Sequence, residues 1–123
     1  MVNKPKIQGT RFETGTVNLL KSWGYKAYRL AEGGLKDEGD VQVEIQNNKL
    51  PQTEVIFECK ARQNLNIHQT YFKAKQKAGD KPLVLAWKKL VNKGSNVRRS
   101  PDGVSTLYII DEDLLKDLLE NYG

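Results

Sequence analysis

Two adjacent segments with strand-like patterns constrain the fold of this chain more than any other feature. Residues 40–45, DVQVEI, alternate polar and apolar side chains strictly. Residues 53–60, TEVIFECK, form a second strand-like segment after a polar turn at 46–52. Alternation with a period of two is typical of a β-strand that turns one face to a core. The two segments therefore predict an antiparallel hairpin over 40–60.

The rest of the chain combines helical and extended patterns. Apolar residues recur at near-helical spacing in residues 10–23, and Gly24 follows as a typical helix end. Asp111 precedes a leucine-rich segment and is a suitable cap for a last helix. The remaining segments are predicted as a strand at 25–30, a glycine-rich loop at 31–39, a helix at 66–79, a short apolar strand central in the sheet at 82–87, a basic loop at 88–103 and a strand at 104–110. The predicted order is α-β-β-β-α-β-β-α, an α/β fold with a mixed central β-sheet flanked by helices.

Length and composition narrow the class of protein. A chain of 123 residues suits one domain, with a core over about 6–110 and an acidic C-terminal helix over 111–123. No apolar run is long enough to span a membrane, and the N-terminus lacks the apolar centre of a signal peptide. Cys59 is the single cysteine and His68 the single histidine, which excludes an internal disulfide and a zinc site built from Cys and His. A reducing, cytoplasmic setting is expected.

The charge of the chain is unevenly distributed. Residues 1–110 contain 19 basic and 10 acidic residues, a net charge of +9, whereas residues 111–123 carry a net charge of −4. A basic body with a separate acidic end indicates a polyanionic partner, and nucleic acid is the usual one. A basic protein without such a partner is the alternative.

Three carboxylates and a lysine are expected to lie near each other. Asp40 begins the first strand of the hairpin, and pairing brings it near Glu58 on the same face, with Lys60 one pleat further along. Glu13 lies on the first helix, which must pack on the sheet. This set suits metal-assisted phosphodiester hydrolysis, because Mg²⁺ takes oxygen ligands and needs only one or two carboxylates. Two simpler interpretations stay open, a turn role for Asp40 and a solvated ladder pair of Glu58 with Lys60.

These residues resemble the motif of the PD-(D/E)XK nuclease superfamily. The segments GTRFE at 9–13, GYKAYRL at 24–30, GDVQV at 39–43 and ECK at 58–60 are similar in order and spacing to archaeal-type Holliday junction resolvases and their phage relatives. The resemblance covers about residues 6–90 and implies a restriction-endonuclease-like fold. The chain departs from the family in having Gly39 where proline is usual and Thr14 where archaeal members often have arginine. Its 31–39 loop also lacks the serine often found in the mobile loop of archaeal members. These departures weaken the case for strict four-way-junction specificity.

The resemblance also implies roles for individual residues. Asp40 and Glu58 resemble the main Mg²⁺ ligands, Glu13 the helix acid that completes the metal site, and the Cys59 carbonyl a possible further ligand. Mn²⁺ is expected to substitute for Mg²⁺. The lysine of the motif is Lys60, and the basic residue of the first strand that faces the scissile phosphate is Arg29.

Two residues at the start of the second predicted helix have less certain roles. Gln69 lies where related nucleases often place an active-site glutamine, but Asn66 and Gln69 also fit a capping pair at a helix start. Catalysis and capping are equally good interpretations of Gln69. A lone histidine in a first helical turn, such as His68, is more often a surface or DNA-facing residue than a general base.

The expected function is a Mg²⁺-dependent endodeoxyribonuclease that resolves four-way DNA junctions by paired nicks, in recombination and repair. A four-way junction is two-fold symmetric, which suits a homodimer. Its interface candidates were Leu83, Leu85, Trp87, Tyr71 and Phe72, all of which also fit an ordinary core. The alternatives are another nuclease of the superfamily, of restriction or nicking type, and a basic nucleic-acid-binding module without catalysis.

The expected DNA-binding residues are basic and scattered over most of the chain. They are Lys6, Arg11, Arg29, Arg62, Lys88, Lys89, Lys93, Arg98 and Arg99. The last five belong to the glycine-containing basic loop predicted at 88–103, which is suited to gripping phosphates. The expected partner is branched double-stranded DNA. The family implies either a viral or phage protein acting in the host cytoplasm or an archaeal protein.

Overall fold

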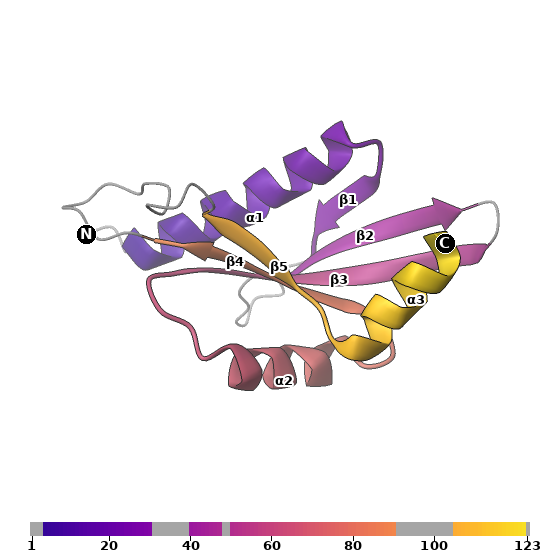
Figure 1. The fold of residues 1–123 in the computed structure, drawn as a ribbon. Helices are drawn as coiled ribbons and strands as arrows, with labels where there is room; N and C mark the ends of the chain where they lie inside the picture. The colour runs from indigo at the N-terminus through magenta and orange to yellow at the C-terminus, as the bar shows by residue number, and fades with distance from the viewer. Residues whose placement is uncertain (1–3, 31–39, 48–49, 91–104, 123) are drawn as a thin grey trace.

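The computed structural model describes residues 4–30, 40–47, 50–90 and 105–122 of the chain. The elements are α1 (Lys4–Ser22), β1 (Lys26–Arg29), β2 (Asp40–Asn47), β3 (Leu50–Arg62), α2 (Ile67–Ala78), β4 (Leu83–Lys89), β5 (Thr106–Ile109) and α3 (Glu112–Tyr122). Their order confirms the predicted one. Figure 1 shows a sheet with α1 on one face and α2 on the other. The chain therefore forms a small α/β domain with a five-stranded mixed sheet.

The sheet has the strand order β1-β2-β3-β4-β5. The first three strands form an antiparallel meander, β3 and β4 run parallel with α2 as the connection between them, and β5 pairs antiparallel with β4. A parallel pair needs a crossover, and a helix is the usual one. The strand expected at 82–87 is β4, an interior strand with neighbours on both sides, while β3 lies at the middle of the sheet. Strand β4 continues to Lys89, so the start of the basic loop predicted at 88–103 is wrong, because Lys88 and Lys89 pair with the end of β3.

The hairpin of β2 and β3 is longer than the sequence predicted. The expected turn at 46–52 is wrong in extent, because β2 continues to Asn47 and β3 begins at Leu50. The pairing of these strands is irregular between Ile45 and Asn47. The alternating apolar residues show only which part of the hairpin faces the core. Backbone hydrogen bonds between antiparallel strands do not need an apolar face, so the two strands continue to pair beyond that part.

Helix α1 also exceeds its prediction. It begins at Lys4 rather than at residue 10, and Pro5 is tolerated in its first turn because the first N–H groups of a helix have no intrahelical acceptor. It ends at Ser22, and Gly24 follows with a φ of 96°, a conformation that glycine adopts without strain. The apolar stripe therefore marked only the part of the helix that packs on the sheet.

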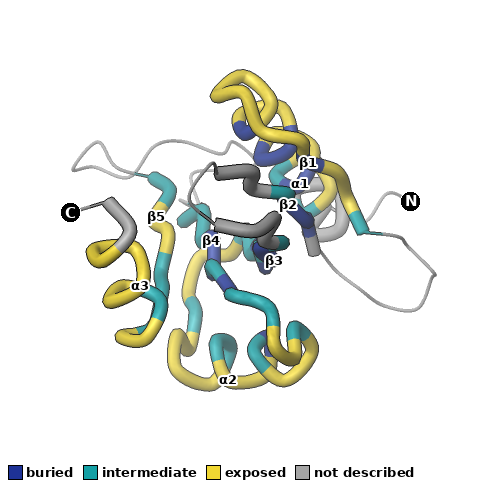
Figure 2. The backbone as a smooth tube through the Cα atoms, turned by 90° about the vertical axis from the view of Figure 1, so that its right-hand side faces the viewer, coloured by how far each residue is buried: buried dark blue, intermediate teal, exposed yellow. Residues whose placement is uncertain are grey.

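Alternation along the strands divides the core into two layers, one on each face of the sheet. Figure 2 shows the buried residues mainly in the strands and in α1, while α2 and α3 are largely exposed. The layer under α1 contains Val17, Leu20, Ala27, Val41, Val43, Cys59 and Ala86. The layer under α2 contains Ile56, Ala74 and Leu83, with Tyr71 packed against it. Burial of an aliphatic side chain such as Leu83 contributes about 1.5–3 kcal/mol to stability. The two faces of β3 therefore pack against different helices, one against α1 and the other against α2.

The caps of the later helices agree with the sequence. The side chain of Asn66 accepts a hydrogen bond from the Gln69 backbone N–H at 3.1 Å, and Gly79 ends α2 with a φ of 67°. The side chain of Asp111 accepts from the Leu114 backbone N–H at 2.9 Å, which confirms it as the cap of α3. These bonds satisfy N–H groups that the first turn of a helix leaves without a backbone acceptor.

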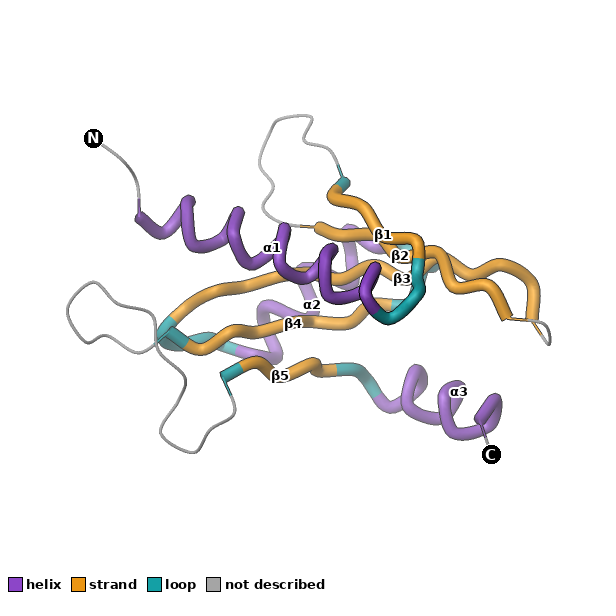
Figure 3. The backbone as a smooth tube through the Cα atoms, turned by 90° about the horizontal axis from the view of Figure 1, so that it is seen from above, coloured by secondary structure: helices purple, strands orange, loops and turns teal. Residues whose placement is uncertain are grey.

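An exposed apolar surface lies at the β5 edge of the sheet. Figure 3 shows that α3 continues from β5 and lies away from α1. Leu115, Leu118 and Leu119 are large, apolar and exposed at helical spacing on α3, the helix that follows β5, and we term these three leucines the α3–β5 apolar surface. Leu107 and Tyr108 are also exposed, but as consecutive residues of β5 they point to opposite faces of the sheet. Two of the expected interface residues, Leu83 and Leu85, are instead fully buried in the core, while Phe72 is exposed. None of the helices among the described residues is long and apolar enough to cross a membrane.

Candidate active site

Glu58 is the most deeply buried carboxylate among the described residues, with 2% of its surface exposed. It lies in β3 on the face that α2 covers. Its Oε2 lies 3.2 Å from the Lys60 Nζ, and its Oε1 lies 3.4 Å from the Lys77 Nζ. The side chain of Lys60 is 14% exposed, and that of Lys77 is half exposed. A carboxylate in the middle of the sheet is thus held between two ammonium groups.

The burial of Glu58 is energetically costly. A carboxylate taken out of water loses several kcal/mol of hydration, and ion pairs with good geometry only partly offset this loss. A hydrophobic residue at the same position would pack without such a cost. Glu58 is therefore poorly explained as a solvated ladder pair with Lys60, and a functional role accounts better for its position.

Asp40 lies directly opposite Glu58 in the register of β2 and β3. Residues opposite each other in an antiparallel pair share a face of the sheet. The prediction that the hairpin brings these two positions together is confirmed at the level of the backbone. The side chain of Asp40 lies outside the part of the chain that the structure describes.

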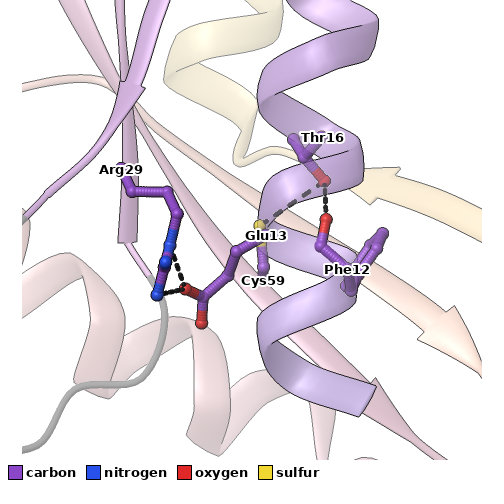
Figure 4. Close-up of polar contacts among 5 residues, drawn as sticks. All are labelled: Phe12, Glu13, Thr16, Arg29 and Cys59. Atoms are coloured by element: carbon purple, nitrogen blue, oxygen red, sulfur yellow. Dashed lines mark hydrogen bonds and ion pairs between the residues drawn. The ribbon is translucent and has the colours of Figure 1, made fainter. Parts of the chain in front are cut away.

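Glu13 is the second buried carboxylate, with 7% of its surface exposed. Its Oε1 accepts a hydrogen bond from Arg29 Nε at 3.0 Å and lies 2.9 Å from Arg29 Nη2. Figure 4 shows this contact between α1 and the end of β1. Two nitrogen atoms of one guanidinium on one carboxylate oxygen form a strong, charge-assisted contact. Arg29 keeps 42% of its side chain exposed, so it also faces solvent.

Cys59 connects β3 to α1. Its Sγ lies 3.8 Å from the Thr16 Oγ1, and the Thr16 hydroxyl donates to the Phe12 carbonyl at 2.8 Å (Figure 4). The Cys59 side chain thus belongs to the core under α1, as the alternation of the strand predicted. The expected role of its carbonyl as a metal ligand stays a prediction.

The two buried carboxylates lie on opposite faces of the sheet. Glu13 and Arg29 are on the α1 face, and Glu58 is on the α2 face. Along the strands they are close, because Arg29 pairs with Val41, the residue that follows Asp40. No described contact joins Glu13 to Glu58. The expected convergence of all three acids on one ion therefore stays a prediction. It depends on the start of β2, where the adjacent residues Asp40 and Val41 pair with Glu58 and Arg29 on opposite faces of the sheet.

A polar network that the sequence did not reveal lies next to Glu58 on the same face. Gln42 is buried and donates to the Tyr28 hydroxyl at 2.7 Å. It also accepts from Lys81 Nζ at 3.1 Å, and Lys81 lies 3.1 Å from a Glu54 carboxylate oxygen. Gln42 is two residues from Asp40 in β2. This network therefore fixes the strand that carries one of the candidate ligands.

Lys77 and Lys81 were missed as residues of this region. The sequence feature that could have indicated them is a series of lysines through α2 and the turn after it, at positions 73, 75, 77 and 81. Residues four apart on a helix share a face, but the sequence does not fix which face meets the sheet. Only the docking of α2 through Ala74 and Tyr71 sets that rotation.

The roles of Gln69 and His68 are only partly resolved. Both residues are exposed in the first turn of α2. The Gln69 backbone N–H bonds to Asn66, so the capping interpretation is confirmed for Asn66. Catalysis by the Gln69 side chain stays a prediction, and the exposure of His68 agrees with the surface role expected of it.

Several expected DNA-binding residues gather at one end of β3 and β4. Lys88 and Lys89 pair with Ala61 and Arg62 in the register of these strands. The Lys89 ammonium donates to the Gln63 carbonyl at 2.8 Å and lies 5.6 Å from the centre of the Trp87 ring. Arg11 is exposed on α1. The side chain of Lys6 and the residues Lys93, Arg98 and Arg99 lie outside the described residues.

The donor chemistry fits a hard divalent cation. Asp40 and Glu58 supply carboxylates at opposite positions of neighbouring strands, and Glu58 already attracts two cationic groups. Among the described side chains, which do not include that of Asp40, no group of three or more His, Cys, Asp or Glu is arranged to hold a metal ion. A site here would use Glu58 together with Asp40, and the contribution expected of Glu13 stays a prediction.

The sequence matches no protein-family model, and no curated protein is significantly similar to it. Function is therefore inferred from the site itself.

Proposed function

We propose that this protein is a Mg²⁺-dependent, structure-selective endodeoxyribonuclease with a restriction-endonuclease-like fold, related to the Holliday junction resolvases. The observation that supports this proposal best is the buried Glu58, opposite Asp40 and in contact with Lys60. Such a carboxylate is costly to bury and chemically suited to a metal-dependent hydrolase. The basic body of the chain is the second support.

In this proposal the chain positions DNA and the attacking water. When bound, Mg²⁺ would supply Lewis-acid activation of the phosphodiester and of the water. Asp40 and Glu58 would hold it. Lys60 Nζ lies beside Glu58 and is largely enclosed, so it can orient the water or offset charge that develops on the phosphate. Arg29 holds Glu13, and because its side chain is 42% exposed it would also be accessible to an incoming phosphate.

A homodimer completes the proposal. Resolution of a four-way junction needs two matched nicks, and a two-fold dimer presents two sites in that relation. The α3–β5 apolar surface is the described region suited to such a contact, because single exposed leucines are common on protein surfaces, whereas three on one side of a helix are less so. This surface replaces the buried Leu83 and Leu85 as the proposed interface.

A nucleic-acid-binding module without catalysis is the second candidate. The observation that favours it is the position of Glu13, whose contacts lie on the opposite face from Glu58. In that case Glu13 and Arg29 would only tie α1 to the sheet. The burial of Glu58 argues against this candidate, because an enclosed carboxylate contributes nothing to a surface that binds nucleic acid.

One experiment separates the two candidates. A labelled four-way DNA junction and a linear duplex of the same sequence are incubated with the protein, with and without Mg²⁺. Paired nicks in the junction that require Mg²⁺ support the proposal. Tight binding to both DNAs without any cleavage over a range of Mg²⁺ and Mn²⁺ concentrations would favour the binding module. Equal cleavage of both DNAs would favour a less selective nuclease of the same kind.

A further inference from the structure

Lys77 is the unexpected partner of the candidate metal ligand. It lies in the last turn of α2 and reaches Glu58 Oε1 at 3.4 Å, while Lys60 occupies the other oxygen, Oε2, at 3.2 Å. Among the described contacts, each oxygen of this carboxylate therefore lies within 3.4 Å of an ammonium group. The sequence motif includes Lys60, but nothing in it includes Lys77.

The two lysines differ in their freedom to move. Lys60 is on the same strand as Glu58, two residues away, and only 14% of its side chain is exposed. Lys77 comes from a separate element, and half of its side chain is exposed. A half-exposed lysine can turn its ammonium into water at little cost, because its four-carbon stem is flexible and its charge is then fully hydrated.

A divalent cation at Glu58 would compete with the two ammonium groups for the carboxylate oxygens. One carboxylate cannot keep two ammonium groups and an Mg²⁺ ion at contact distance, because like charges a few ångströms apart repel strongly in a partly buried site. One ammonium must leave an oxygen for the ion to bind. Lys77 is the group with a path to solvent.

On the basis of the proposed metal-dependent function, we propose that Lys77 is a positioning residue that competes with the metal. It holds Glu58 Oε1 when no metal is bound, which keeps the buried carboxylate compensated and correctly oriented. It yields that oxygen to the divalent ion. Lys77 therefore sets how tightly the protein binds metal, and Lys60 stays in place for the reaction.

Metal affinity measured without DNA tests this directly. Mn²⁺ is titrated into the metal-free protein, and free Mn²⁺ is followed by electron paramagnetic resonance. Lys77→Gln removes the competing charge and keeps a polar side chain, so it should bind Mn²⁺ roughly fivefold more tightly than the natural protein. Lys77→Arg keeps the charge and should retain the natural affinity within about twofold.

Lys73→Gln is the matched control. Lys73 is exposed on α2, one helical turn before Lys77, and neutralising it changes the net charge by the same amount. It should leave Mn²⁺ affinity nearly unchanged. An equal gain in Lys73→Gln and Lys77→Gln would show a general charge effect and overturn the specific role.

A thermal measurement supplies the second readout. Without metal, Lys77→Gln should melt at a lower temperature than Lys73→Gln, because Glu58 has lost a partner. Saturating Mn²⁺ should raise its melting temperature more than that of the natural protein. Unchanged or weaker Mn²⁺ binding in Lys77→Gln would overturn the inference while leaving the proposed function intact. Absence of Mn²⁺ binding in the natural protein and in every variant would overturn both.

Discussion

At the scale of single residues, burial separates the candidate chemistry from ordinary surface charge. Glu58 and Glu13 are acidic residues that the fold encloses, and each is held by a basic side chain. Most charged side chains stay in water because hydration is worth more to them than any contact in the protein. The enclosed pairs are therefore the places where a change of one residue should alter function most.

Removal of a candidate metal ligand is the first prediction. Asp40→Asn and Glu58→Gln should each abolish junction cleavage, because an amide is a poor ligand for Mg²⁺ in place of a carboxylate. Both should bind junction DNA as tightly as the natural protein or more tightly, since a negative charge near the phosphates is gone. Gel-shift and cleavage assays on the same preparations check both statements. Full cleavage activity in either variant would disprove the metal-site assignment.

Lys60 supplies the second prediction. Lys60→Ala should lower the cleavage rate at saturating DNA by about 100-fold or more, because its ammonium acts where charge develops in the reaction. Circular dichroism should show an unchanged fold, and binding to DNA should change little. If the variant loses thermal stability but keeps its rate, Lys60 serves only as an ion-pair partner of Glu58.

At the scale of elements, the two helices that pack on the sheet have distinct roles. Helix α1 carries Glu13 and covers the face with Cys59, and α2 carries Lys77 and covers the face with Glu58. Helix α2 begins after the Asn66 cap and ends at Gly79, and the packing of Ala74 and Tyr71 sets its rotation against the sheet. A change in a cap should therefore affect stability before it affects chemistry.

The Asn66 cap gives the third prediction. Asn66→Ala removes the side-chain acceptor for the Gln69 N–H and should lower the free energy of unfolding by about 1 kcal/mol. Urea denaturation measures this loss, and Asn66→Asp is the control that restores an acceptor. The stability and cleavage rate of Gln69→Ala should then be compared with those of Asn66→Ala. A large fall in cleavage rate with unchanged stability in Gln69→Ala would assign Gln69 to the active site, because Asn66 alone supplies the cap.

At the scale of the whole molecule, charge and apolar surface are separated. The basic residues at the ends of β3 and β4 lie apart from the acidic helix α3, which follows β5 at the other end of the sheet (Figure 3). Helix α3 carries the exposed leucines. A polyanion would be attracted to the first region and repelled from the second. In the proposed function, this arrangement would leave the α3–β5 apolar surface available for a protein contact while the DNA substrate binds elsewhere.

The fourth prediction concerns this surface. Leu119 is 64% exposed, and Leu115 lies one helical turn before it. The double variant Leu115→Asp with Leu119→Asp should be monomeric in sedimentation equilibrium if the natural protein is a dimer through α3, because charges at the centre of an apolar contact are not tolerated. Lys116→Asp, on the same helix, is the control for added charge and should remain dimeric. A dimer that survives the double variant would place the interface elsewhere.

The sequence by itself determined the order of the elements, the β2 and β3 hairpin, the caps at Asn66 and Asp111, and the opposite positions of Asp40 and Glu58. These features depend on neighbours in the chain or on the period of two in a strand, so a local pattern records them. It also fixed which residues of β3 share a face.

Only the tertiary structure decided which helix covers each face. That choice places Glu13 and Glu58 on opposite sides of the sheet, brings Lys77 to Glu58, and buries Leu83 and Leu85 while α3 keeps its leucines exposed. Contacts between a helix and a sheet depend on how the helix rotates and docks, and this is set by packing among residues far apart in the chain. A periodic sequence shows that a helix has an apolar face, but it does not say which polar side chains beside that face will meet the sheet.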